Sequence, residues 1–159
     1  MTEYRIVKTD DYLQFENLFT ASGLEFNLDE SGTGPEGFVT AFACMGEDGA
    51  LMGAAAVCRR KGCFILNDIA VEQGHRGKQI GKELLFRSLS EMRGLGASEV
   101  YITAKAPLFF KKYGFCYLDG NQVPDVFGCL SCSRYGKDCS PKFMKLTMGA
   151  ESVFEKPME

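Results

Sequence analysis

The chain contains 159 residues and carries a formal net charge of −3, with 18 Lys and Arg against 21 Asp and Glu. This length fits one ordinary domain, and the acidic balance offers no broad basic surface to a nucleic-acid backbone. Apolar runs such as Ala54–Cys58 are far too short to cross a bilayer. Residues 1–20 have the pattern of neither a signal peptide nor a transit peptide. We therefore expect a cytoplasmic globular protein that binds neither nucleic acid nor membrane.

The first half of the chain is predicted to be rich in strands. Hydrophobic periodicity and turn residues predict a strand over Thr2–Lys8, a helix from Asp10 or Asp11 to about Ser22, and a hairpin of Phe38–Met45 and Leu51–Arg59. The next apolar run, Cys63–Val71, is apolar on both faces and is typical of a central strand. Asp68 lies inside this run, and a buried carboxylate needs either a partner or a chemical purpose.

The second half alternates helices and strands. An amphipathic helix is expected to follow Gly81 and to end near Arg93, and Pro107 and Gly114 bracket a short helix. Strands are predicted over Val100–Ala104, Phe115–Leu118 and Phe143–Met148. This order predicts an α/β (α+β) fold with a single mixed, mostly antiparallel central sheet flanked by helices.

A glycine-rich basic loop between the central strand and the long helix is the strongest chemical signal. The free amide groups of a helix N-terminus form an anion site, to which Arg76, Lys78 and Lys82 add positive charge. The loop is no P-loop, because Lys82-Glu83 follows Gly81 where that motif requires Lys-Ser or Lys-Thr. The same residues also fit a solvated basic helix start that only turns the chain.

The segments Asp68–Val71 and Arg76–Lys82 resemble the acyl-CoA signature of the GNAT superfamily of N-acetyltransferases. A second landmark of that family, a short helix that ends in Gly-Phe, resembles Phe109–Phe115. The two landmarks stand in the family's order and spacing, and the resemblance covers roughly residues 3–118. It implies a GNAT-like acyl-CoA N-acyltransferase fold with acetyl-CoA as co-substrate.

The resemblance also implies which residues bind the cofactor. The strand at Ile69–Val71 would splay from its neighbour and pair with the pantetheine arm, and the amides of Arg76–Lys82 would hold the pyrophosphate. The cofactor-binding residues implied are Ile69, Ala70, Val71, Arg76, Gly77, Lys78, Gln79, Ile80, Gly81, Lys82 and Phe110. Gln79 stands where the family usually has its first motif glycine, and Phe110 stands where many members have a tyrosine that protonates the leaving thiolate.

The reaction itself requires a base, because an amine nucleophile is mostly protonated near neutral pH. Asp68 is the first candidate, against the alternative of a purely structural carboxylate. Tyr113 lies one helical turn after Phe110, so it is the candidate general acid, against the alternative of a packed aromatic. We interpret His75, the only histidine, as a neighbour of the phosphates.

The cysteines raise the question of a metal. Cys129, Cys132 and Cys139 form a Cys-x2-Cys-x6-Cys array within the segment 119–141, and x2 spacing suits tetrahedral zinc. Structural zinc requires four ligands, and Cys116 would complete the set only if the fold brings it near. We therefore expect reduced structural cysteines and assign no metal ligands, keeping zinc as the alternative. The acetyltransferase domain is expected to span 1–148, followed by a frayed tail over 149–159.

The stretch from Thr103 through the cysteine array to Met144 resembles, more loosely, short N-acetylglutamate synthases and related amino-acid N-acetyltransferases. This resemblance suggests an α-amino acid as acceptor, whose carboxylate would need a cation. The candidates are Arg59, Arg60, Lys105 and Lys111, each against the alternative of a solvated surface charge. We therefore expect an enzyme that acetylates a small-molecule amine by direct attack in a ternary complex. The alternative is a non-catalytic acyl-CoA-binding regulatory module, and a homodimer through the last strands is suggested by family analogy.

Overall fold

The computed structural model describes residues 4–76, 79–119, 122–124, 126 and 142–148. Its strands are β1 (Tyr4–Thr9), β2 (Phe38–Gly46), β3 (Leu51–Arg60), β4 (Cys63–Val71), β5 (Glu99–Ala104), β6 (Cys116–Tyr117) and β7 (Lys142–Thr147). Its α-helices are α1 (Glu16–Ala21), α2 (Ile80–Gly94) and α3 (Pro107–Lys112), and two 3-10 helices are η1 (Tyr12–Phe15) and η2 (Gln73–His75).

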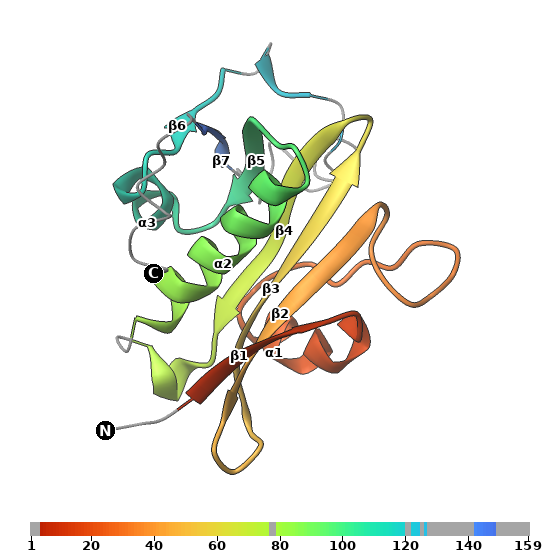
Figure 1. The fold of residues 1–159 in the computed structure, drawn as a ribbon, viewed down its shortest axis with the longest axis vertical. Helices are drawn as coiled ribbons and strands as arrows, with labels where there is room; N and C mark the ends of the chain where they lie inside the picture. Colours follow the sequence, from red (N-terminus) through yellow and green to blue (C-terminus); the bar gives the residue numbers. More distant parts are fainter. Residues whose placement is uncertain (1–3, 77–78, 120–121, 125, 127–141, 149–159) are drawn as a thin grey trace.

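The seven strands form one sheet in the order β1-β2-β3-β4-β5-β7-β6, as Figure 1 shows. Every pairing is antiparallel except that of β4 with β5, which is parallel. Helix α2 provides the crossover between these two strands, and it lies across the sheet beside β3 and β4 (Figure 1). The expected mixed, mostly antiparallel sheet with flanking helices is confirmed.

Each face of the sheet is covered by a different core. Leu84, Leu85 and Leu89 of α2 pack against β2–β5 on one face, which we call the α2 face. Tyr12, Phe15 and Phe19 pack against small residues of β2, β3 and β4 on the other, which we call the α1 face. The small residues are Ala41, Ala43, Ala54, Ala56 and Ala70. These alanines let the aromatic rings of η1 and α1 approach the sheet closely, because they leave room above the strands.

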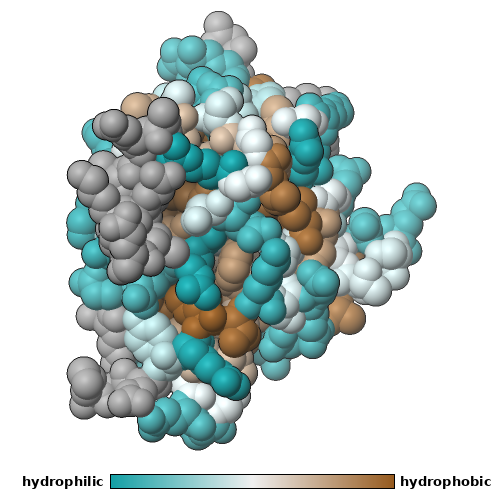
Figure 2. All heavy atoms as spheres, in the orientation of Figure 1, coloured by the Kyte–Doolittle hydropathy of each residue, from teal (hydrophilic) through white to brown (hydrophobic). Residues whose placement is uncertain are grey.

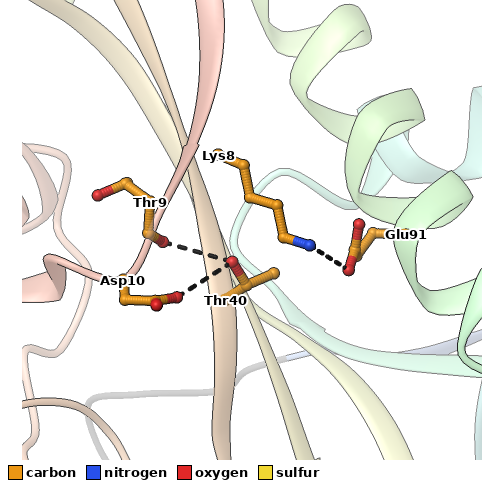
Figure 3. Close-up of polar contacts among 5 residues, drawn as sticks. All are labelled: Lys8, Thr9, Asp10, Thr40 and Glu91. Atoms are coloured by element: carbon orange, nitrogen blue, oxygen red, sulfur yellow. Dashed lines mark hydrogen bonds and ion pairs between the residues drawn. The ribbon is translucent and has the colours of Figure 1, made fainter.

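Side chains fasten the edge strand β1 to its surroundings. Lys8 forms an ion pair with Glu91 of α2 at 2.8 Å, and the hydroxyl of Thr40 lies 3.4 Å from the Thr9 carbonyl and 3.5 Å from Asp10 (Figure 3). Arg87 of α2 also donates to the Ile6 carbonyl at 3.0 Å. An exposed strand edge is a site for unwanted pairing, and these contacts from α2 shield it.

Two expectations about secondary structure are wrong. The single helix expected from Asp10 or Asp11 to Ser22 is a 3-10 turn followed by the short α1, and the Asp11 side chain makes no capping hydrogen bond. The aromatic residues Tyr12 and Phe15 must both reach the sheet, and the 3-10 turn places residues three apart in line. The strand expected over Phe115–Leu118 is reduced to Cys116–Tyr117, because Phe115 is buried against Phe110 instead.

Parts of the expected organisation lie outside the described residues. These are the tail 149–159 and most of the segment 119–141, which includes Cys129, Cys132 and Cys139. Among the residues that the structure describes, no helix combines the length and apolar character that a membrane span requires.

Candidate active site

A cavity opens where β4 and β5 separate. The two strands pair only at Phe64 with Val100 and at Ile65 with Tyr101, so the sheet is split from Leu66 onward. The cavity has a volume of about 420 Å³ and is lined by residues from both faces of the sheet. Ile80 and Phe110 contribute from the α2 face, and Asp68 and Leu24 contribute from the α1 face. The split therefore joins the two faces through the sheet.

A β-bulge at Asn67 sets which face Asp68 occupies. Ala56 of β3 pairs with Asp68, whereas the next residue, Val57, pairs with Leu66. Asn67 is therefore an extra residue in β4, and it shifts the alternation of side chains by one position. Before the bulge Leu66 packs on the α2 face, and after it Ile69 does. Asp68 consequently lies on the α1 face, beside the bulged Asn67.

Asp68 is buried and held by two donors on one oxygen. Only 4% of the surface of Asp68 is exposed to solvent. Oδ2 accepts hydrogen bonds from the Tyr12 hydroxyl at 2.7 Å and from Nδ2 of Asn67 at 2.8 Å. Burial raises the pKa of Asp68 to about 6, although both hydrogen bonds and the charge of Arg60 act in the opposite direction. A carboxyl group of this pKa is a base near neutral pH and stays protonated in mild acid.

Arg60 supports Asn67 from the other side. Its guanidinium is nearly buried, with 12% of the side chain exposed, and it donates three hydrogen bonds. Nε donates to the Glu36 carbonyl at 2.7 Å, Nη1 to the Val126 carbonyl at 3.0 Å, and Nη2 to Oδ1 of Asn67 at 2.7 Å. The guanidinium thus ties two loop segments to the bulge, and Asn67 links it to Asp68.

Alternate amide groups of β4 point toward the split between β4 and β5. The amide of Glu72, directly after β4, donates to the Met52 carbonyl of β3 at 2.8 Å. Because amide groups alternate sides along a strand, those of Val71 and Ile69 point away from β3 toward the split. Nε of Arg76 donates to the Val71 carbonyl at 3.2 Å, which agrees with this orientation.

The N-terminus of α2 forms the far end of the cavity. Arg76, Gln79, Gly81 and Lys82 line it, and Gln79 precedes the helix in a left-handed conformation with φ of 67°. This is the conformation in which glycine is ordinarily favoured, so the side chain at this motif position is accommodated at a conformational cost. Cationic side chains and a helix N-terminus together favour an anionic group here.

Most of the residues expected to bind the cofactor line this one cavity. They are Ile69, Ala70, Val71, Arg76, Gln79, Ile80, Gly81, Lys82 and Phe110. Gly77 and Lys78 lie outside the described residues. His75 also lines the cavity, and its Nε2 lies 3.8 Å from Oε1 of Glu72.

An aromatic cluster on α3 borders the middle of the cavity. Phe110 is buried and packs edge-on against Phe109 and Phe115. Tyr113 packs edge-on against Phe86 and Phe109, with ring centroids 5.4 and 5.3 Å apart, and it also lines the cavity. Both aromatic contacts use the ring of Tyr113 and leave its hydroxyl uninvolved.

The end of the cavity on the α1 face carries one of the four candidate cations. Lys105 lines it beside Ser22 and Leu24, and its amine donates to the Gly23 carbonyl. The other three are engaged elsewhere. Arg59 lies over the Phe64 ring at 4.7 Å, Lys111 lies over the Tyr117 ring at 5.7 Å, and Arg60 is held in the network described above.

Sequence reasoning missed two polar groups of this site. The first is Tyr12, a tyrosine on the apolar stripe of a predicted helix. A buried tyrosine hydroxyl needs a hydrogen-bond partner, and so does a buried aspartate. Considering the two requirements together would have indicated a hydrogen bond between Tyr12 and Asp68. The second is Thr103, which lines the cavity and whose buried hydroxyl has no hydrogen-bond partner among the described residues. A threonine within a strand gives no such signal by itself.

The described residues include no group of three or more His, Cys, Asp or Glu side chains placed to hold a metal ion. Four cysteines are described, and all are free thiols: Cys44, Cys58, Cys63 and Cys116. The zinc alternative depends on cysteines outside the described residues.

Comparison with known proteins agrees with this geometry. The acetyltransferase (GNAT) domain family matches residues 39–117, which run from β2 to β6 and include the whole split. No curated protein gives a significant match. The family match supports an acetyltransferase that uses acetyl-CoA as co-substrate. The chain belongs to the GNAT superfamily.

Solved structures share the fold at low sequence identity. An acetyltransferase of the GNAT family from Staphylococcus aureus Mu50 superposes with a TM-score of 0.68 at 14% identity, covering 92% of this chain and 100% of that one. N-acetylglutamate synthase from Neisseria gonorrhoeae, in complex with coenzyme A and N-acetyl-glutamate, gives 0.70 at 17% identity, covering 94% of this chain and 35% of that one. An IAA acetyltransferase from Bacillus cereus gives 0.66 at 15%, covering 92% and 100%.

Proposed function

We propose that the protein transfers the acetyl group of acetyl-CoA to the primary amine of an α-amino acid or a closely related small molecule. The observation that carries this proposal is that Asp68 and Lys105 line the same cavity. An α-amino acid presents an ammonium group and a carboxylate a few bonds apart. A buried carboxylate and a cationic amine are complementary to these two charges.

The cofactor enters from the α2 face in this proposal. Its pyrophosphate binds at the N-terminus of α2 with Arg76 and Lys82, and the pantetheine arm follows the exposed edge of β4 toward the split. The amide of Ile69 or Val71 donates to the thioester oxygen, whose negative charge grows as the amine attacks. The acceptor binds from the α1 face, so that the two substrates meet where the sheet is open.

The transfer is direct. Asp68 accepts a proton from the ammonium group, the neutral amine nitrogen attacks the thioester carbonyl carbon, and a C–N bond forms. The C–S bond then breaks, the electron pair leaves on the CoA sulfur, and the attacking nitrogen releases its second proton to solvent as the amide forms. Tyr113 is the candidate to return a proton to that thiolate. Because a model thiol has a pKa of about 8.5, this last step needs only modest assistance.

A pooled acceptor assay tests the proposal. Acetyl-CoA is incubated with the protein and a mixture of amino acids and polyamines, and acetylated products are identified by mass spectrometry. We expect one acetylated amino acid, formed at least about 100-fold more slowly by Asp68→Asn. The variant should still gain thermal stability from acetyl-CoA as the wild type does, because its cofactor contacts are intact. No product, together with retained stabilisation by acetyl-CoA, would instead support a non-catalytic acyl-CoA-binding module.

A further inference from the structure

The carboxylate of Asp68 is held asymmetrically. Both of its protein donors, Tyr12 and Asn67, reach Oδ2. No donor of the described residues reaches Oδ1, and Asp68 lines the cavity. A carboxylate that rotated freely would present either oxygen to the substrate amine. The two hydrogen bonds to Oδ2 therefore determine that Oδ1 is the oxygen available to that amine.

The orientation of Asn67 depends in turn on Arg60. A side-chain amide can place its oxygen or its nitrogen toward Asp68, and only the nitrogen donates. Nη2 of Arg60 can only donate, and it lies 2.7 Å from Oδ1 of Asn67. The guanidinium therefore fixes the amide with its nitrogen toward Asp68. The bulge makes this chain of contacts possible, because neighbouring side chains of a regular strand point to opposite faces.

We propose that Arg60 is a positioning residue that acts through Asn67 to hold Asp68 with Oδ1 toward the acceptor amine. This inference rests on the proposed role of Asp68 as the base. Arg60 itself does not line the cavity, and its other two donors anchor it to the carbonyls of Glu36 and Val126. It is therefore fixed by the scaffold rather than by the substrate.

Among the described groups that shift the pKa of Asp68, Arg60 is the charged one. Tyr12 reaches it from η1, and Cys58 and Arg60 approach from β3. Burial raises the pKa of the Tyr12 hydroxyl, and it raises the pKa of the Cys58 thiol to about 12, so both are neutral at physiological pH. Lys105 lines the same cavity after β5. Removing Arg60 should therefore raise the pKa of Asp68, as should removing Asn67.

The test uses Asn67→Ala, Arg60→Met and the double variant in the full-length protein. Arg59→Met is the matched control, because Arg59 is the same residue type one position away and lies over Phe64. The Asp68 carboxyl is titrated by 13C NMR, with its signal assigned by its loss in Asp68→Asn. The pH profile of kcat/KM is measured for each variant.

We expect the Asp68 midpoint and the acid limb of kcat/KM to move upward together by roughly half to one pH unit in each single variant. The double variant should move no further than Arg60→Met, and Arg59→Met should not move. Equal midpoints in wild type and Asn67→Ala would overturn the proposal. Additive shifts in the double variant would also overturn it, because they would mean that Arg60 acts only as a charge through space.

Two features keep the result decisive. Arg60→Met removes the hydrogen bonds to the carbonyls of Glu36 and Val126, and it is liable to fold poorly. Asn67→Ala keeps these two hydrogen bonds and removes only the connection between Arg60 and Asp68. The NMR midpoint is independent of activity. If Asp68→Asn were fully active, the proposed base would be wrong, and the midpoints would still show whether Arg60 acts through Asn67.

Discussion

The Tyr12 hydroxyl donates to Oδ2 of Asp68 at 2.7 Å, which joins a 3-10 helix near the start of the chain to the strand that forms the wall of the cavity. Tyr12 is also stacked on Phe26, with ring centroids 5.0 Å apart and planes inclined by 10°. The segment after α1 and the buried carboxylate are therefore coupled through one side chain. A ligand that moves Phe26 would act on Asp68 through Tyr12.

The raised pKa of Asp68 predicts the pH dependence of the reaction. Burial raises this pKa to about 6, and the base must be ionised to accept a proton. We expect kcat/KM to fall as the pH decreases through about 6, by about tenfold for each further unit. A steady-state pH profile measures this limb, and it should be absent from the residual activity of Asp68→Asn. A profile flat down to pH 4 would exclude Asp68 as the base.

The same carboxyl is predicted to lower the stability of the fold above pH 6. Its pKa rises from 3.8 in the unfolded chain to about 6 in the folded protein, so the unfolded state loses the proton first and stability falls between these values. Two pH units correspond to about 3 kcal/mol. We expect Asp68→Asn to be more stable than wild type by up to this amount at pH 7, because the asparagine oxygen still accepts from Tyr12. Urea denaturation at pH 7 and pH 4 measures the difference, which should nearly vanish at pH 4.

Lys105 is predicted to recognise the acceptor carboxylate. We expect Lys105→Met to raise KM for the amino acid by roughly 10- to 100-fold, the effect of one charge-assisted hydrogen bond. Lys111→Met is the matched control, because Lys111 lies over Tyr117 and outside the cavity. The carboxamide of the same amino acid should be a poor substrate for wild type and an equally poor one for Lys105→Met. If wild type used acid and amide alike, Lys105 would have no such role.

Tyr113→Phe tests the general acid. The phenylalanine keeps both edge-on contacts, with Phe86 and Phe109, so any effect is assigned to the hydroxyl. Because the leaving thiolate is only moderately basic, we expect kcat to fall by about 10- to 100-fold, at the lower end of general acid catalysis or below it. Tyr117→Phe, on the exposed β6, is the control. A change in kcat of less than about twofold would make Tyr113 a packing residue.

The turn that leads into β2 is predicted to be intolerant of any side chain. A Cβ atom at Gly37 would lie 2.2 Å from the Arg59 carbonyl oxygen, and Gly32 has the same left-handed φ in open space. We expect Gly37→Ala to reduce the free energy of unfolding by about 3 kcal/mol more than Gly32→Ala does. Chemical denaturation of the two variants isolates the clash, because the conformational strain of alanine is common to both.

Local patterns predicted the sheet well, and they indicated which residues line the end of the cavity at α2. Strong periodicity marked β2, β3 and β4, and the glycines and cations before α2 indicated an anion site, because both signals lie in consecutive residues. The break between η1 and α1 could not be predicted, since it depends on how the rings of Tyr12 and Phe15 meet alanines of distant strands.

The acceptor end was harder to predict for the same reason. Asp68 was recognised as unusual, but its partners lie 56 and 8 positions earlier in the chain, and nothing local connects Tyr12 or Arg60 to it. The four candidate cations could be separated only by their positions in space, because their sequence surroundings are alike. Asn67 did interrupt the apolar run, and two successive polar residues in a buried strand are a signal of a bulge.

The bulge gives β4 one side chain that the pairing with β3 does not require. Leu66 and Ile69 are three positions apart and still lie on the same face of the sheet, because Asn67 is an extra residue between them. Deleting Asn67 would restore the regular alternation and leave Asp68 and Ile69 on their present faces, but it would remove the amide that donates to Asp68 and accepts from Arg60. A relative with one residue fewer here would keep its carboxylate on the same face of the sheet, but it would have no side chain between that carboxylate and the arginine.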